Sequence, residues 1–173
     1  MLRQKTGAKS FPFHATYFTS MEIVTQRNEI SNFEFSHRLS YVHQILVARK
    51  LTNRISLQLS PTFIHRNLVA NPDISNDLWA VGIGGRYNIT TNLSINIESF
   101  YIDHGETPEG IEYYIPLSIG IDLDTGVHVF QIMVTNSLPM REVGFITETQ
   151  GDWFNGDLRL GFNISRTFNL VNY

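Results

Sequence analysis

The sequence contains no cysteine and has few charged side chains. The absence of cysteine excludes a disulfide framework and any metal site built on thiolates. Charged residues make up 17% of the chain, below the quarter that is usual for soluble domains. The net charge is −3, and no run of basic residues interleaved with aromatics occurs. Nucleic acid is therefore excluded as the main partner.

Long apolar runs are also missing. No stretch of about 18 apolar residues occurs, which excludes a transmembrane helix. A membrane-spanning β-strand remains compatible with the sequence, because its lumen-facing residues dilute the apolar signal. The first ten residues have no apolar core and no small-residue cleavage site, so they are not a signal peptide. We expect one β-barrel domain over residues 1–173, as the carboxy-terminal part of a longer barrel.

Alternation of apolar and polar residues is present throughout the chain. Eight segments alternate apolar and polar residues with a period of two, the pattern of a strand with two unlike faces. In the clearest segment, the apolar positions between Ile111 and Leu123 alternate with Glu112, Ser118, Gly120 and Asp122. No segment keeps helical spacing, so the chain is predicted to be all-β. The predicted strands are residues 11–24, 33–50, 55–65, 79–89, 93–102, 111–123, 127–135 and 157–170.

The connections between these segments alternate between long and short. Residues 25–32, 67–78, 103–110 and 136–156 form long loops, whereas 51–54, 90–92 and 124–126 form tight turns. In an antiparallel up-and-down meander, this puts every long loop at one end, as in outer-membrane barrels. Most segments also reach the roughly 9–11 residues that a tilted membrane strand needs. We therefore expect a transmembrane β-barrel, or most of one, with its apolar side chains facing lipid and its backbone paired around the closed sheet of the complete barrel.

Aromatic residues support the membrane interpretation. They gather towards segment ends, as an interfacial girdle would: Phe11, Phe13, Phe33, Phe35, Phe63, Trp79, Tyr87, Tyr101, Tyr113 and Phe168. A soluble, lipocalin-like barrel with the apolar face turned inward is a weaker alternative. Each strand carries many large apolar side chains, more than a small interior could hold.

Charged residues in phase with the polar face are candidates for lining a lumen. They comprise Glu34, Arg38, Arg86, Glu98, Glu112, Asp122 and Arg159. Such rows can line a selective, porin-like channel for small polar solutes. They can equally be paired charges that fill a small barrel, which would then serve as a membrane anchor or docking platform through its long loops.

Histidines are the candidates for metal-binding or catalytic residues. His37, His43, His65 and His128 are in phase with the apolar face, but His37 and His43 lie roughly 20 Å apart on one strand and cannot share an ion. Ser36 and His37 are adjacent, so they point to opposite faces and form no nucleophile–base pair. We expect no metal, no cofactor and no enzymatic activity. His43 is expected to be neutral or covered by a neighbouring strand, because an ionised side chain at mid-membrane costs about 2–4 kcal/mol.

Glycines in the segment Gly82-Ile83-Gly84-Gly85 resemble a phosphate-binding loop only superficially. No helix is predicted after them, and strand glycines more often allow curvature or close approach.

Several segments resemble an uncharacterised β-barrel family of the Bacteroidetes outer membrane. They read FSHRLSYVHQILVARK, SLQLSPTFIHRNLV, VGIGGRYNIT, DLDTGVHVFQIMVTNS, GFITETQGDW and LRLGFNISRTF. The family motif usually written Gly-Gly-His appears here as Gly126-Val127-His128. The resemblance implies a barrel in the bacterial outer membrane, with the lipid bilayer as partner, and implies no activity or protein partner. Family members are longer at the amino end, which implies that residues 2–9 end an earlier strand and that the full barrel exceeds eight strands.

Overall fold

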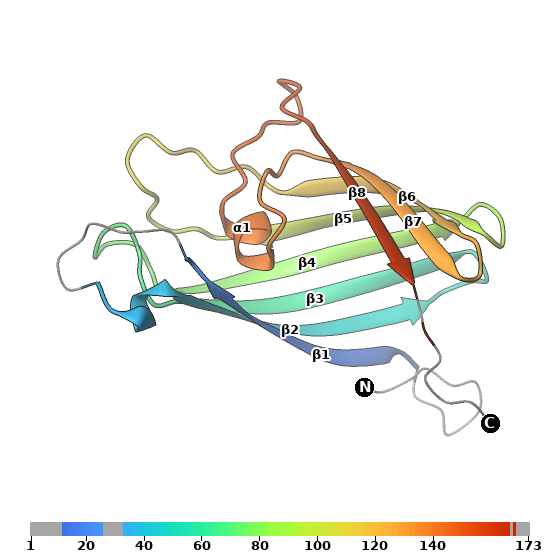
Figure 1. Ribbon diagram of the computed structural model, residues 1–173, viewed down its shortest axis with the longest axis horizontal. Coiled ribbons are helices and arrows are strands. Elements are labelled where there is room, and N and C mark those ends of the chain that lie inside the picture. The colour runs from blue at the N-terminus through green and yellow to red at the C-terminus, as the bar shows by residue number, and fades with distance from the viewer. Residues whose placement is uncertain (1–11, 26–32, 167, 169–173) are drawn as a thin grey trace.

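The computed structural model describes residues 12–25, 33–166 and 168. Eight strands follow one another as an antiparallel up-and-down meander in a single sheet, ordered β1 to β8 (Figure 1). A short 3-10 helix η1 precedes β2, and one short helix α1 lies between β7 and β8. The bounds are β1 His14–Ile23, η1 Phe35–Arg38, β2 Leu39–Lys50, β3 Ile55–Arg66, β4 Asp77–Asn88, β5 Leu93–Ile102, β6 Leu117–Asp124, β7 His128–Thr135, α1 Glu142–Thr147 and β8 Arg159–Arg166. The predicted all-β meander is confirmed.

The predicted alternation of long and tight connections is also confirmed, and the three tight turns share one device. The hydroxyl oxygen of Thr52 accepts hydrogen bonds from the backbone N–H groups of Arg54 and Ile55. Thr90 and Thr125 accept equivalent bonds in the turns after β4 and β6. A threonine hydroxyl that bonds the backbone two or three residues on holds a turn without any distant contact. These turns therefore fix the register of the β2–β3, β4–β5 and β6–β7 hairpins locally.

The apolar face of the sheet points outward. Large apolar side chains of every strand are exposed on the convex surface, among them Tyr17, Ile45, Trp79, Tyr101 and Leu160. The inward-turned soluble barrel does not agree with this arrangement. Within the described residues, no helix is both long and apolar enough to cross a membrane.

The inner face differs from the uniformly polar surface that the alternation predicts. Near the tight turns it carries polar residues such as Ser94 and Asp122, but near the long loops it is apolar. There α1 packs against the sheet, and Val143 and Ile146 of the helix are each 1% exposed. The apolar positions of the sheet in this cluster are Val42, Ile64, Leu78, Ala80, Phe100 and Ile102. Burying an aliphatic side chain stabilises by roughly 1.5–3 kcal/mol, so the short helix depends on this contact.

Two strands begin well after their predicted starts, whereas the other described strand starts differ by at most three residues. Residues 35–38 form η1, so β2 begins at Leu39 and not at residue 33. The sixth strand begins at Leu117 and not at residue 111, because Pro116 has no N–H for the ladder and its carbonyl instead accepts from Phe100 and Ser99. The start of the first predicted strand at Phe11, most of the loop 25–32, residues 2–9 and the final residues of the last predicted strand lie outside the described residues.

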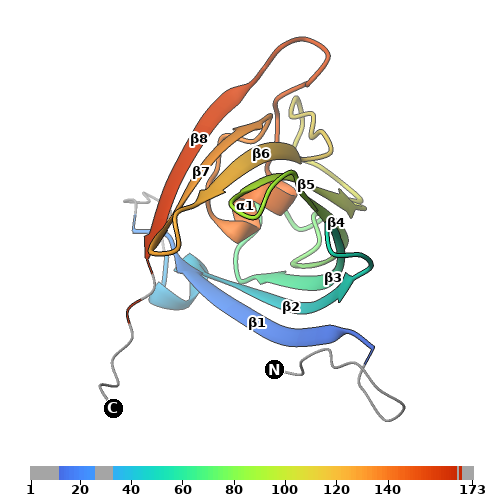
Figure 2. The same ribbon diagram turned by 90° about the vertical axis from the view of Figure 1, so that its right-hand side faces the viewer.

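The sheet is curled but open. Within the described residues β1 pairs only with β2 and β8 only with β7, so the ladder does not close between β1 and β8 (Figure 2). The described part forms a half-barrel, which agrees with the expectation of part of a barrel, and pairing around a closed sheet is not completed within the described residues. In hydrocarbon, both free edges need hydrogen-bond partners.

Candidate functional site

The loop between β7 and β8 enters the interior of the curled sheet. Both ribbon views place α1 on the concave side (Figures 1 and 2). The ring of Phe145 meets Phe100 of β5 edge-on, with ring centroids 6.0 Å apart. The helix has Arg141 at its N-cap position without a side-chain cap, so it depends on tertiary contacts rather than on its own ends.

A charged triad ties α1 to the first strand. The Arg141 guanidinium donates to the carboxylates of Glu22 at 2.8 Å and Glu148 at 2.7 Å. The other oxygen of Glu22 accepts from the backbone N–H of Val143 at 3.2 Å, at the start of the helix. Because Glu22 is only 13% exposed, its charge depends on these donors. The contact joins α1 to β1 at the free edge of the sheet.

Asn136 fixes the loop where it leaves β7. It is 2% exposed, and its side-chain amide donates to the carbonyls of Ile115 at 3.0 Å and Gly151 at 2.8 Å. Its side-chain oxygen accepts from the Leu117 N–H at 2.9 Å. A Cβ added at Gly151 would lie 2.3 Å from the Asn136 carbonyl oxygen, so this close approach requires glycine. Three chain segments are thus held together by one buried amide.

Three cavities lie along the interior, and α1 separates two of them. The outer cavity, about 390 Å³, lies at the long-loop end and is lined by Arg66, His104, Val143 and Thr147, among others. The inner cavity, about 580 Å³, lies on the other side of the helix and is lined by Phe18, Phe100, Phe145 and Ile146. A turn-end cavity of about 320 Å³ is lined by Arg86, Glu98 and Asp122. The helix thus lies across the path between the outer and inner cavities.

Three of the predicted lumen residues come together at the turn-end cavity. Arg86 and Asp122 approach to 3.6 Å, and the side-chain amide of Gln131 donates to Asp122 at 3.0 Å. Glu98 lines both the turn-end and inner cavities. The Asp122 side chain is 6% exposed, so a cation and an amide compensate its burial.

The other four predicted residues lie apart. Arg159 begins β8 and lines the inner cavity. Glu34 is the N-cap residue of η1, and Arg38 in η1 donates to the Val24 carbonyl at 2.8 Å and lies over the Phe33 ring. Glu112 lies in the connection before β6. The positions of Glu34, Arg38 and Glu112 follow from the two strand starts that the alternation placed too early.

The histidines form no metal site in the described part of the chain, which contains no group of three or more potential ligands. His43 lies on the outer face, where its Nδ1 is 2.6 Å from the Tyr17 hydroxyl and its ring stacks on Phe63. Phe63 contacts Trp79 on the next strand, with ring centroids 4.8 Å apart. His43 is thus covered by neighbouring strands and belongs to an aromatic row across β1 to β4, near the long loops. One step towards those loops, His65 Nδ1 lies 2.5 Å from Asp77.

Sequence reasoning missed the residues that position α1 and line the outer cavity, chiefly Arg66 and Arg141. A signal was available for the helix contact, because Val42, Ile64 and Phe100 are apolar residues in phase with the polar face. Apolar residues on both faces near one end of a strand indicate that something covers the inner face there.

A curled antiparallel meander with an exposed apolar outer face and sorted loops defines a β-barrel domain of a membrane. The chain belongs to the family described as "Membrane bound beta barrel domain (DUF5777)", whose family model matches residues 1–168. The resemblance to an uncharacterised barrel family is thereby confirmed. Comparison with curated proteins and with solved structures finds no significant match.

Proposed function

We propose that this chain is a single-domain outer-membrane barrel protein of a bacterium, or the carboxy-terminal part of a longer one, with an interior closed by α1. It acts as a membrane anchor or docking platform that presents its long loops, and it catalyses no reaction. The observation that carries the proposal is the burial of Val143 and Ile146 against the apolar inner face, between the outer and inner cavities. A helix seated in this way excludes water and ions from the path that it crosses.

The orientation follows from the loops. Outer-membrane barrels carry long loops outside the cell and short turns in the periplasm, so α1 lies at the extracellular end. The aromatic row of His43, Phe63 and Trp79 then lies near the outer membrane–water interface, where amphipathic rings are favoured.

A passive channel for small polar solutes is the second candidate. It is favoured by Arg86, Glu98 and Asp122, which line the turn-end cavity with both charge signs. Arg159 extends this lining into the inner cavity, while Glu34, Arg38 and Glu112 lie towards the long-loop end. A solute can pass only if α1 leaves its site, so this function requires a gated rather than an open barrel.

Conductance separates the two candidates. The full chain is first refolded into detergent micelles, and a heat-dependent mobility shift on gels checks that a barrel forms. The wild type, V143D/I146D and F154D/N155D are then compared in planar bilayers. The first variant adds two carboxylates to the buried side of α1. The second adds two carboxylates to the same loop at exposed side chains that line none of the three cavities.

We expect no steady current from the wild type or from F154D/N155D, and ion-conducting steps from V143D/I146D, because buried carboxylates expel the helix. Steady conductance by the wild type would refute the closed barrel and support the channel. A wild type that is soluble and monomeric without detergent would refute both candidates.

A further inference from the structure

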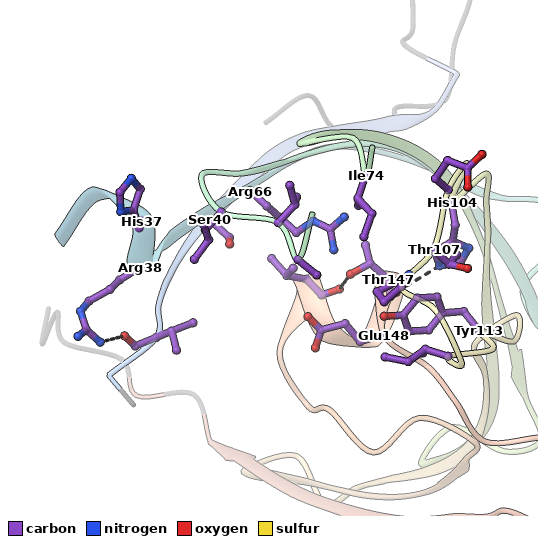
Figure 3. A pocket seen from close by; sticks show the side chains of 18 of the residues that line it. His37, Arg38, Ser40, Arg66, Ile74, His104, Thr107, Tyr113, Thr147 and Glu148 are labelled. Atoms are coloured by element: carbon purple, nitrogen blue, oxygen red, sulfur yellow. Dashed lines mark hydrogen bonds between the residues drawn. The ribbon is translucent and has the colours of Figure 1, made fainter. Parts of the chain in front are cut away.

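The outer cavity is a second candidate site, distinct from the closure of the barrel. It opens between the loops that follow β3 and β5, η1, and the carboxy-terminal end of α1 (Figure 3). Its volume of about 390 Å³ lies within the range of small-molecule sites. Apolar side chains make up part of its wall, including Leu68, Val69, Ile74 and Ile111.

Arg66, at the end of β3, brings an incompletely paired cation to this cavity. One terminal nitrogen of its guanidinium donates to the Ser75 carbonyl at 3.3 Å, whereas its Nε is buried and has no hydrogen-bond partner. No carboxylate of the described residues lies within 4.0 Å of it. The nearby Glu148, on the α1 side of the cavity in Figure 3, instead pairs with Arg141. A buried guanidinium N–H without an acceptor is costly, and a carboxylate is the natural bidentate partner of an arginine.

His104 and Tyr113 form an aromatic pair that lines the same cavity as Arg66. The rings of His104 and Tyr113 stack with centroids 4.9 Å apart, and both residues line the cavity. Burial is the largest cause that lowers the pKa of His104, so its imidazole is neutral at pH 7. Burial also raises the pKa of Tyr113, which keeps its hydroxyl protonated. The pair thus offers a flat, uncharged surface and adds no cation of its own.

We propose that the outer cavity binds a small organic acid, with its carboxylate on Arg66 and its apolar body against His104, Tyr113 and the aliphatic wall. The carboxylates of Glu106 and Glu148 at the same cavity disfavour a doubly charged ligand such as phosphate. Val143 and Thr147 of α1 form one wall of this cavity, but the residues proposed to contact the ligand, Arg66, His104 and Tyr113, belong to β3 and to the connection between β5 and β6.

Benzoate is a suitable probe because it is soluble and combines one carboxylate with a flat apolar ring. Binding is measured by calorimetry on the refolded full chain in micelles, with benzamide as the uncharged analogue and inorganic phosphate as the multiply charged anion. R66Q removes the cation, and R54Q removes an arginine from a tight turn at the other end of the sheet as the matched control.

We expect the wild type and R54Q to bind benzoate alike, and R66Q to bind it at least about tenfold more weakly, as the loss of a charge-assisted hydrogen bond predicts. Benzamide and phosphate should bind much more weakly than benzoate. A70W, which adds bulk at an exposed loop position lining the cavity, should also abolish binding while keeping the heat-dependent mobility shift; it provides the test if R66Q does not fold.

The proposal is overturned if the wild type does not bind benzoate, or if R66Q or a folded A70W binds as well as the wild type. Equal affinity for benzamide would also overturn it, because the arginine would then have no part in recognition. Conductance is unaffected by any of these results, so failure here is distinct from failure of the closed barrel.

Discussion

The Arg141 guanidinium donates to the Glu22 carboxylate at 2.8 Å across 119 residues of sequence. Glu22 belongs to the first strand, and Arg141 immediately precedes the helix inside the sheet. Together with the bond from the Val143 N–H to the same carboxylate, this contact joins the free edge of the sheet to the element that fills its interior.

Removing the Glu22 charge should loosen α1. We expect Glu22→Gln to weaken the docking of the helix by about 1 kcal/mol, because Arg141 is half exposed and part of its attraction is screened. Chymotrypsin cleavage after Phe145 should then be about fivefold faster than in the wild type. Glu109→Gln, which changes an exposed loop carboxylate, should leave the cleavage rate unchanged. Equal rates in both variants would show that the triad does not hold the helix.

Gly82 should not tolerate a side chain. An added Cβ would lie 2.4 Å from the Phe100 ring, so Gly82→Ala should lower the free energy of unfolding in micelles by about 1–3 kcal/mol. Gly84 lies two residues further on the same strand, and the nearest atom to its added Cβ is 3.6 Å away. Gly84→Ala should therefore change the urea midpoint little. Similar losses in both variants would contradict the close approach of Phe100.

Asn136 should be the most sensitive polar residue of the β7–β8 loop. Asn136→Ala leaves an N–H and two carbonyls without partners, so we expect a loss of about 2–4 kcal/mol in the free energy of unfolding. Asn163→Ala removes a bond between the exposed Asn163 side chain and Gln131, and should cost less than about 1 kcal/mol. Urea unfolding followed by Trp153 fluorescence compares the two variants. Equal costs would mean that the amide does not organise the loop.

His104 should make the long-loop end sensitive to acid. Its folded pKa lies below the ordinary value of 6.5, mainly because burial disfavours the charged ring. The unfolded state then binds the proton more tightly, so stability is full above pH 6.5 and falls as the pH drops through 6.5 towards the folded pKa. The unfolding free energy measured between pH 8 and about pH 5 should lose this component in His104→Gln. An unchanged pH profile would contradict the burial of the ring.

The two tryptophans should report different surroundings. Trp79 is 70% exposed on the outer face, whereas the Trp153 indole donates to the Leu117 carbonyl from within the β7–β8 loop. Brominated lipids should therefore quench the fluorescence of W153F, which retains Trp79, more strongly than that of W79F. The reverse order would mean that the outer face does not contact lipid.

The sequence predicts the meander well because a period of two and the turn residues are local signals. Thr52, Thr90 and Thr125 lie in short turns between clear alternating segments. The edges of the strands were less predictable, since the pattern continues through 33–38 and 111–116 although η1 and Pro116 interrupt the ladder there. The period of two in the sequence does not by itself indicate where strand pairing ends.

The interior was harder to predict, for a different reason. The helix α1 has six residues, fewer than two turns, so no helical period can emerge. Its contacts with Glu22 and Phe100 join positions far apart in the chain, which no local pattern encodes. Of the predicted lumen residues, Arg86, Glu98 and Asp122 meet at one cavity because the alternation assigned each of them to the inner face of a strand.

The threonine turns place the residues that set strand register at one end of the sheet. Each hairpin that they close needs only three or four ordered residues to set its register, so its pairing can form early and at low entropic cost. The long connections at the other end of the sheet therefore do not have to specify strand alignment. Residues there that do not seat α1, unlike Asn136 and Gly151, can change the surface chemistry of that rim without disturbing the alignment of the strands.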